Sequence, residues 1–139
     1  MTARALFVLC ALGLAACAAP PGPGAAASAQ PLAGTRWVGV VEGSPDAQTL
    51  PRLEFSAGGR LAGYTGCNMM SGSWREEGGE ARFGPILSTK RFCAGPEGEV
   101  EKRVMAALAP GARGVREGSR LVLIAPNGAR FEFSPAAAS

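Results

Sequence analysis

The chain contains no histidine, and Asp46 is its single aspartate. Without imidazole it lacks the Ser-His-Asp and Cys-His nucleophilic arrangements, the usual zinc sites and the commonest general base near neutral pH. Carboxylate chemistry would have to come from glutamates such as Glu54 and Glu132. Both lie within expected strands, where a solvated, outward side chain is the simpler interpretation. We therefore expect a protein that is not an enzyme, with no catalytic residues, no bound metal and no cofactor.

Two further patterns are missing. No glycine-rich phosphate loop precedes a helix, which gives no support to nucleotide binding. The formal net charge is +3, but the arginines are scattered singly, and no Lys/Arg run interleaves with aromatic residues. A nucleic-acid partner is therefore not expected.

The N-terminus has the pattern of a secretion signal. Arg4 supplies a positive charge, and Ala5–Leu14 is uncharged and mostly apolar, yet too short for a bilayer span, which takes about 20 residues. Leu14-Ala15-Ala16-Cys17 places small side chains at a cleavage site and a thiol at the new N-terminus. We predict that residues 1–16 are a signal peptide and that Cys17 is lipidated. The alternative is an ordinary signal peptide cut elsewhere.

The mature chain then divides into three parts. Residues 17–31 contain mainly Ala, Pro, Gly and Ser, which predicts a lipidated, disordered tether. Residues 32–134 form the folded domain, and residues 135–139 a disordered tail. The chain is expected in the cell envelope, contacting the membrane through its lipid. Ala18 follows the cysteine, which in a Gram-negative cell favours the outer membrane, facing the periplasm.

The chain has four cysteines. Cys10 leaves with the signal and Cys17 carries lipid, so Cys67 and Cys93 remain in a domain exported to an oxidising compartment. Such a pair most often forms a disulfide, which would stabilise the domain by roughly 3.5 kcal/mol. A metal pair and a reactive thiol are the alternatives, although two thiolates without histidine make a poor zinc site.

Short apolar-alternating runs, separated by turn signals, recur from Leu32 onward. The predicted strands are Thr35–Val41, Arg52–Ser56, Arg60–Tyr64, Ser71–Arg75, Glu80–Phe83, Arg113–Arg116, Arg120–Ala125 and Ala129–Phe133. Leu121–Ala125 is apolar on both faces, which suggests a central or doubly covered strand.

One segment breaks this period. Pro96–Ala109 places Val100, Val104 and Leu108 on one helical stripe, which predicts a helix that covers a sheet or plugs a barrel mouth. A partner-binding helix is the alternative. The fold class is therefore α+β and β-dominated: a small antiparallel sheet or barrel-like domain with one covering helix.

A motif with unusual composition lies between strands. Gly66-Cys67-Asn68 is followed by Gly72 and later by Thr89 and Cys93. Gly66 permits a backbone geometry that other residues avoid, and Asn68 can bond to its neighbouring backbone in an irregular turn. Thr89 can do the same ahead of Cys93. These residues are expected to fix a stapled loop, with a ligand site as the alternative.

The order of motifs resembles the META domain family, which includes heat-inducible HslJ-type envelope lipoproteins. The resemblance spans residues 32–134 and rests on Trp37, Leu53-Glu54-Phe55, Gly58-Gly59-Arg60, Gly63, Gly66-Cys67-Asn68, Gly72-Ser73-Trp74, Phe83-Gly84, Ser88-Thr89, Cys93, a short helix and Leu121-Val122-Leu123. It implies a compact β-rich domain with one helix and a link to envelope stress. Gly66, Cys67, Asn68, Gly72, Thr89 and Cys93 carry over as motif positions with a structural role.

Three functions are compatible with these patterns. The first is a monomeric, non-enzymatic envelope lipoprotein that binds an envelope protein or a cell-wall partner during stress. The second is an inhibitor of a secreted protease or lysozyme, presented by the disulfide-stapled β scaffold. The third is an enzyme that uses Cys67 or glutamates. The predicted lipid anchor, the tether and the lack of histidine-based catalytic arrangements favour the first function, a binding lipoprotein.

Overall fold

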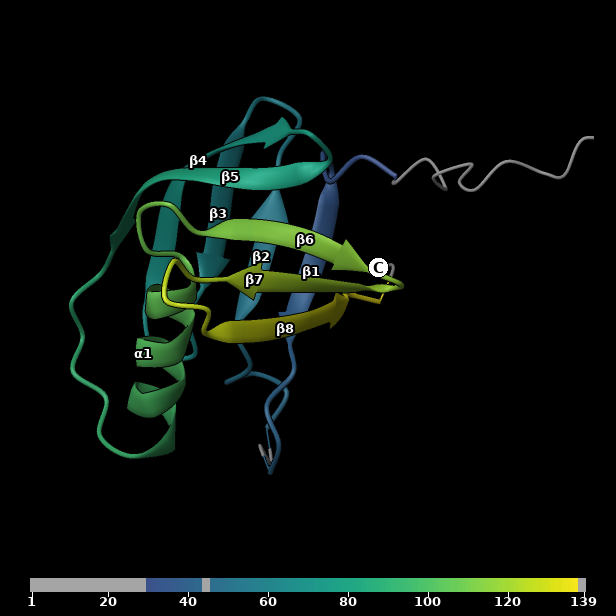
Figure 1. The fold of residues 1–139 in the computed structure, drawn as a ribbon. Coiled ribbons are helices and arrows are strands. Elements are labelled where there is room, and N and C mark those ends of the chain that lie inside the picture. Colours follow the sequence, from purple (N-terminus) through teal and green to yellow (C-terminus); the bar gives the residue numbers. More distant parts are fainter. Residues whose placement is uncertain (1–29, 44–45, 138–139) are drawn as a thin grey trace, which may run out of the picture.

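The structure, a computed structural model, describes residues 30–43 and 46–137, which form eight strands and one helix. The strands are β1 (Thr35–Gly39), β2 (Arg52–Phe55), β3 (Arg60–Tyr64), β4 (Met69–Glu77), β5 (Glu80–Ser88), β6 (Arg113–Glu117), β7 (Arg120–Ile124) and β8 (Arg130–Pro135). Each strand pairs antiparallel with the next, and β8 pairs with β1, so the sheet closes into a barrel (Figure 1). The β-dominated, barrel-like expectation is confirmed. Full closure removes most of the open sheet edge.

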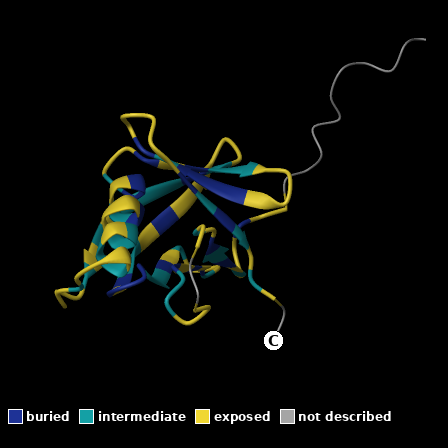
Figure 2. Cartoon of the chain, turned by 90° about the horizontal axis from the view of Figure 1, so that it is seen from below, coloured by how far each residue is buried: buried dark blue, intermediate teal, exposed yellow. Residues whose placement is uncertain are grey.

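The barrel interior holds the hydrophobic core. Buried and exposed residues alternate along the strands, as Figure 2 shows, because successive side chains of a strand point to opposite faces. The largest fully buried apolar side chains are Phe55, Phe131, Phe133, Leu32, Leu53, Leu61, Leu121, Leu123, Val104 and Val122. Phe55 meets Trp74 edge-on, with ring centroids 5.0 Å apart. In β7, Val122 is buried as well as its two neighbours, so this strand is covered on both faces as its composition suggests.

The single helix, α1 (Pro96–Ala107), packs against β8 at one end of the barrel (Figure 1). Proline at its start and two glutamates in its first turn suit the positive end of the helix. Val104 and Leu108 are buried in the core and Val100 packs against it, as the predicted stripe requires. The guanidinium of Arg103 lies 5.1 Å from the centroid of the Phe131 ring. In the described part of the chain, no helix has the length and apolar character needed to cross a membrane.

Strands β4 and β5 are longer than the sequence indicates. The expected range Glu80–Phe83 stops at Gly84-Pro85, which read as a break, and Ser71–Arg75 is two residues short at each end. The two strands instead continue along each other past a bulge between Gly72 and Trp74. A Cβ at Gly72 would lie 2.7 Å from the carbonyl oxygen of Pro85, so the missing side chain allows the close approach. The extension carries the β4–β5 pair to the Cys67–Asn68 turn.

Order at the C-terminus reaches beyond the expected end of the domain at 134. Strand β8 includes Pro135, and the Ala136 N–H donates to the Arg36 carbonyl at 2.9 Å. The expected signal peptide, Cys17 and the tether up to residue 29 lie outside the described residues. The predictions for those segments therefore stay predictions.

Gly63 gives a direct test of how closely β2 and β3 approach. A Cβ there would lie 2.2 Å from the Arg52 carbonyl oxygen, and this backbone atom can move only if the sheet shifts. We expect Gly63→Ala to lower the free energy of unfolding by about 2–3 kcal/mol. Gly58→Ala, which would meet nothing within 4 Å, is the matched control and should change it by less than about 0.5 kcal/mol. Equal urea midpoints for both variants would contradict this packing.

Candidate functional site

The motif predicted from the sequence forms one structural unit beside the start of β4. Cys67, in the turn between β3 and β4, is joined by a disulfide to Cys93 in the segment before α1, with a Cα–Cα distance of 6.1 Å. Gly66 has φ +101°, a conformation that L side chains rarely adopt. A Cβ at this position would also lie 3.2 Å from Cγ1 of Val100 in α1. Glycine is therefore needed both for the turn and for the contact with the helix.

Asn68 lies at the centre of this unit and is only 3% exposed. Its Oδ1 accepts from the Thr89 hydroxyl at 2.7 Å and from the Arg91 N–H at 2.8 Å. Its Nδ2 donates to the Arg91 carbonyl at 2.9 Å and to Glu101 Oε1 at 2.8 Å. The side chain thus joins the turn, the segment before α1, and α1 itself.

These bonds correct the expectation that Asn68 stabilises its own turn. Its side chain serves a distant segment, while Thr65 performs the local role. The Thr65 Oγ1 accepts from the backbone N–H groups of Asn68 at 2.9 Å and Cys67 at 3.3 Å. Thr65 is fully buried, and its hydroxyl also lies 3.3 Å from Glu101 Oε1. Both N–H bonds of the Asn68 carboxamide and both lone pairs of its oxygen are therefore used within the protein.

The Asn68 carboxamide extends the β4–β5 ladder by one rung. The Thr89 N–H donates to the Met69 carbonyl at 3.0 Å, directly beyond the end of β5. Two residues further on, Arg91 gives its N–H and its C=O to the same Asn68 side chain. In an antiparallel pair, a residue exchanges both groups with the backbone opposite, so the carboxamide replaces a partner peptide unit. Thr89 and Arg91 consequently stay bonded to Met69 and Asn68 beyond the end of β5.

Arg91 and Glu101 belong to this unit, and the sequence analysis missed both. The Arg91 guanidinium donates to the Cys67 carbonyl at 2.7 Å, which closes a second link across the disulfide loop. Glu101 lies in the first half of α1, and its carboxylate accepts a hydrogen bond from the Asn68 amide. Glu101 lies three residues before Val104 on the same face of α1, and this position was the available signal. The partners themselves are too far away in sequence to be recognised.

Exposed apolar side chains gather beside this unit. Met69 is 60% exposed, Leu87 73% and Phe92 90%. One hollow of about 390 Å³ is lined by Met69 and Leu87, and a neighbouring hollow of about 410 Å³ by Phe92. The two hollows share Ser88 and Thr89, so they adjoin at the end of β5. We call Met69, Leu87 and Phe92 the apolar surface.

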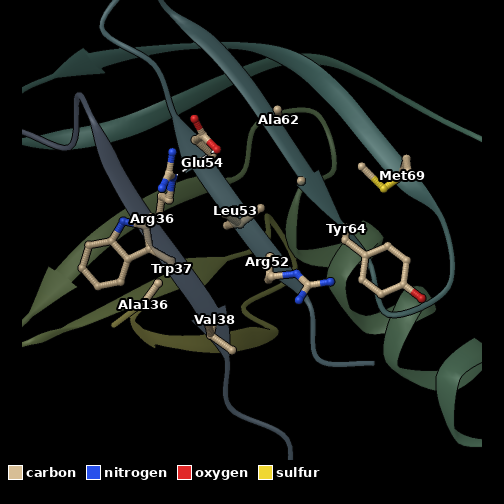
Figure 3. A pocket seen from close by; sticks show the side chains of 11 residues that line it. Arg36, Trp37, Val38, Arg52, Leu53, Glu54, Ala62, Tyr64, Met69 and Ala136 are labelled. Carbon is tan, nitrogen blue, oxygen red and sulfur yellow. Dashed lines mark hydrogen bonds and ion pairs between the residues drawn. The ribbon is translucent and has the colours of Figure 1, made fainter. Parts of the chain in front are cut away.

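A third hollow of about 280 Å³ lies on the outer face of β1–β3 (Figure 3). Arg36 and Glu54 form an exposed ion pair at 3.3 Å on one side of it. Across the hollow, the Arg52 guanidinium lies 5.5 Å from the centroid of the Tyr64 ring. Met69 stands next to Tyr64, so this hollow adjoins the apolar surface.

The two mid-strand glutamates are on the outside of the barrel. Glu54 pairs with Arg36, and Glu132 pairs with Arg120, in both cases with substantial exposure of the two side chains. Such ion pairs contribute about 0–1 kcal/mol each. Within residues 30–43 and 46–137, no group of three or more His, Cys, Asp or Glu residues is placed to hold a metal ion.

Comparison with known proteins identifies the family. Among curated proteins, none matches the chain. The NMR structure of a protein from Burkholderia xenovorans matches with a TM-score of 0.63 and 25% identity, over 87% of this chain and 94% of that one. A second NMR structure, at 23% identity, matches with a TM-score of 0.58 over 73% of this chain and 88% of that one, and shows the fold alone. The META domain model matches residues 30–138, which is most of the chain. The protein therefore belongs to the META domain family.

Proposed function

We propose that this protein is a non-enzymatic envelope lipoprotein whose META domain binds a partner protein during envelope stress. Membrane attachment rests on Leu14-Ala15-Ala16-Cys17, which is outside the described residues. Two observations support a role without catalysis. The chain has no histidine, and the carboxamide oxygen and nitrogen of Asn68 are both hydrogen-bonded to other protein groups. The motif around Gly66-Cys67-Asn68 then serves as a scaffold, and the exposed side chains beside it bind the partner.

The observation that carries this proposal is the exposure of Met69, Leu87 and Phe92 around a rigid unit. Large apolar side chains that are gathered on one area, and not scattered singly, are typical of binding surfaces. The Cys67–Cys93 disulfide and the Asn68 bonds hold the segment that bears Phe92, which lowers the entropy lost on binding. Large apolar side chains such as Met69, Leu87 and Phe92 favour a protein surface over a glycan as the partner.

Deletion and complementation test this function in the cell. A deletion strain should lose survival under heat and detergent, and the full-length chain should restore it. The variant Met69→Ser/Leu87→Ser/Phe92→Ser should restore nothing, although it accumulates to the normal level, because each lost anchor weakens binding by about tenfold. Val40→Ser is the control, since Val40 is 37% exposed and does not line the two shared hollows.

Two outcomes would contradict the proposal. A deletion strain that survives as well as its parent would remove the stress role. Full survival with the triple serine variant would show that Met69, Leu87 and Phe92 are not needed for the function. Protein amount is measured in the same cells, so that a loss of folding is recognised as such.

A second candidate function is inhibition of a secreted protease or lysozyme. The observation in its favour is Phe92, which is 90% exposed on a segment stapled by the disulfide next to it. A rigid, protruding aromatic side chain can enter the specificity pocket of a hydrolase. Full-length protein in micromolar excess should then slow at least one member of a panel of secreted proteases and lysozymes. Full activity of the whole panel would eliminate this candidate.

A further inference from the structure

One strand edge of the barrel is left without a backbone partner. Strand β5 pairs with β4 along its length, but with β6 only at Ala81 and Arg82. Beyond these residues β5 and β6 form no further pairs, and α1 lines a hollow together with residues 88–92. In the described part of the chain, the backbone groups of Lys90 and Phe92 form no hydrogen bond with other protein groups. The closed barrel therefore has a local opening in its hydrogen-bond ladder.

The direction of this free edge follows from Arg91. Because Thr89 and Arg91 turn their backbone groups toward Met69 and Asn68, alternation along an extended chain turns those of Ser88, Lys90 and Phe92 the opposite way. We call the backbone N–H and C=O groups of Ser88, Lys90 and Phe92 the outer edge. Asn68 holds Thr89 and Arg91 in place, so the outer edge is preformed.

A groove runs beside the outer edge. Its volume is about 410 Å³, and its walls are residues 88–92 on one side and Glu101, Lys102 and Met105 of α1 on the other. At one end the chain closes onto the helix, because a Cβ at Gly98 would lie 2.3 Å from the Cys93 carbonyl oxygen. At the other end the groove meets the hollow lined by Met69 and Leu87.

The charge of the groove selects its occupant. Lys90 and Arg91 are exposed, and neither forms an ion pair within residues 30–43 and 46–137. The carboxylate in the wall, Glu101, is already bonded to Asn68. Met105 supplies an apolar contact, and it is partly buried against the core. The walls therefore complement an acidic strand with alternating apolar residues. A second copy of this chain would bring Lys90 and Arg91 against themselves, which is unfavourable.

We propose that the outer edge accepts an extended, acidic segment of a partner protein as an added β-strand. Main-chain hydrogen bonds to Ser88, Lys90 and Phe92 would supply affinity. Apolar residues of the added strand would pack on Met105, and its acidic residues, which share one face of the strand, would pair with Lys90. This inference rests on the proposed binding function and specifies how the partner is held.

The test uses the full-length protein in mild detergent and a fluorescent peptide of alternating valine and glutamate. Polarisation should rise with protein concentration, and the amide exchange of Ser88, Lys90 and Phe92 should slow in the complex. Lys90→Pro removes one donor of the outer edge while keeping the extended conformation, and should weaken binding by about tenfold more than Lys90→Ala does. A valine–lysine peptide, and a valine–glutamate peptide methylated on alternate backbone nitrogens, should each bind at least about tenfold more weakly.

Several results would overturn strand addition. These are no binding of the valine–glutamate peptide at about 1 mM, equal affinity of the methylated peptide, or equal effects of Lys90→Pro and Lys90→Ala. A concentration-dependent dimer that protects the same three amides would assign the outer edge to a second copy instead. The circular dichroism melting curve of Lys90→Pro shows whether that variant is folded, and the peptide controls hold even if it is not. If strand addition fails while the triple serine variant still abolishes survival, the proposed function stands without it.

Discussion

Asn68→Ala is expected to lower the free energy of unfolding by about 3–5 kcal/mol. The change deletes a carboxamide that is 3% exposed and bonded at both ends. It leaves the Arg91 N–H and C=O, the Thr89 hydroxyl and Glu101 without their partner. A buried polar group left unpaired costs about 1–3 kcal/mol, and water admitted to the vacated space recovers part of the sum.

Asn127 supplies a matched control, since it is the other asparagine of the chain. It is exposed in the turn after β7, and its side chain accepts one hydrogen bond, from the Ala129 N–H at 3.0 Å. Asn127→Ala should therefore cost about 0.5–1 kcal/mol in the same urea titration. If the two alanine variants unfold at the same urea concentration, Asn68 is not the structural centre of this domain.

Loss of the disulfide should have an effect of similar size. Cys67→Ala/Cys93→Ala frees a loop with a sequence separation of 26 residues. The chain-entropy estimate for a loop of this length is a loss of about 3.5 kcal/mol in the free energy of unfolding. Urea unfolding of the oxidised protein, the reduced protein and the double variant measures it. The reduced protein and the double variant should agree, and addition of reductant should not alter the variant.

The two changes should also be coupled. Asn68 and the disulfide hold the same segment, residues 89–93, so once one link is lost the other restrains a loop that is already loosened. We expect Asn68→Ala in the cysteine-free background to cost at least about 1 kcal/mol less than in the native protein. Strict additivity would mean that the two links act on separate parts of the structure. Unchanged stability on reduction would show that the bridge contributes little.

Local patterns in the sequence predicted most elements of this fold. Alternation and glycine turns located all eight strands, and the stripe of Val104 and Leu108 located the helix. The redox compartment and the cysteine count predicted the Cys67–Cys93 pair, which the structure contains. These features depend on neighbouring residues, or on a pair of cysteines with no other partner in the domain.

Features that depend on distant contacts were not predictable in the same way. Closure of the barrel brings Gly39 opposite Phe133, and nothing local to either strand marks that pairing. Asn68 looked like a turn residue because its short-range options are common, whereas its partners lie 23 and 33 residues away. The end of β5 was missed because a bulge lets Gly84 and Pro85 remain within the strand pair.

Amide hydrogen exchange of the unliganded full-length chain examines the Asn68 unit and the outer edge together. Arg91 donates its N–H to the buried Asn68 side chain, whereas in the described part of the chain the N–H groups of Lys90 and Phe92 donate to no protein group. The Arg91 amide should therefore exchange as slowly as the amides of β4, and those of Lys90 and Phe92 at nearly the rate of an unstructured peptide. Equal exchange at all three residues would contradict both the structural role of Asn68 and the preformed strand edge.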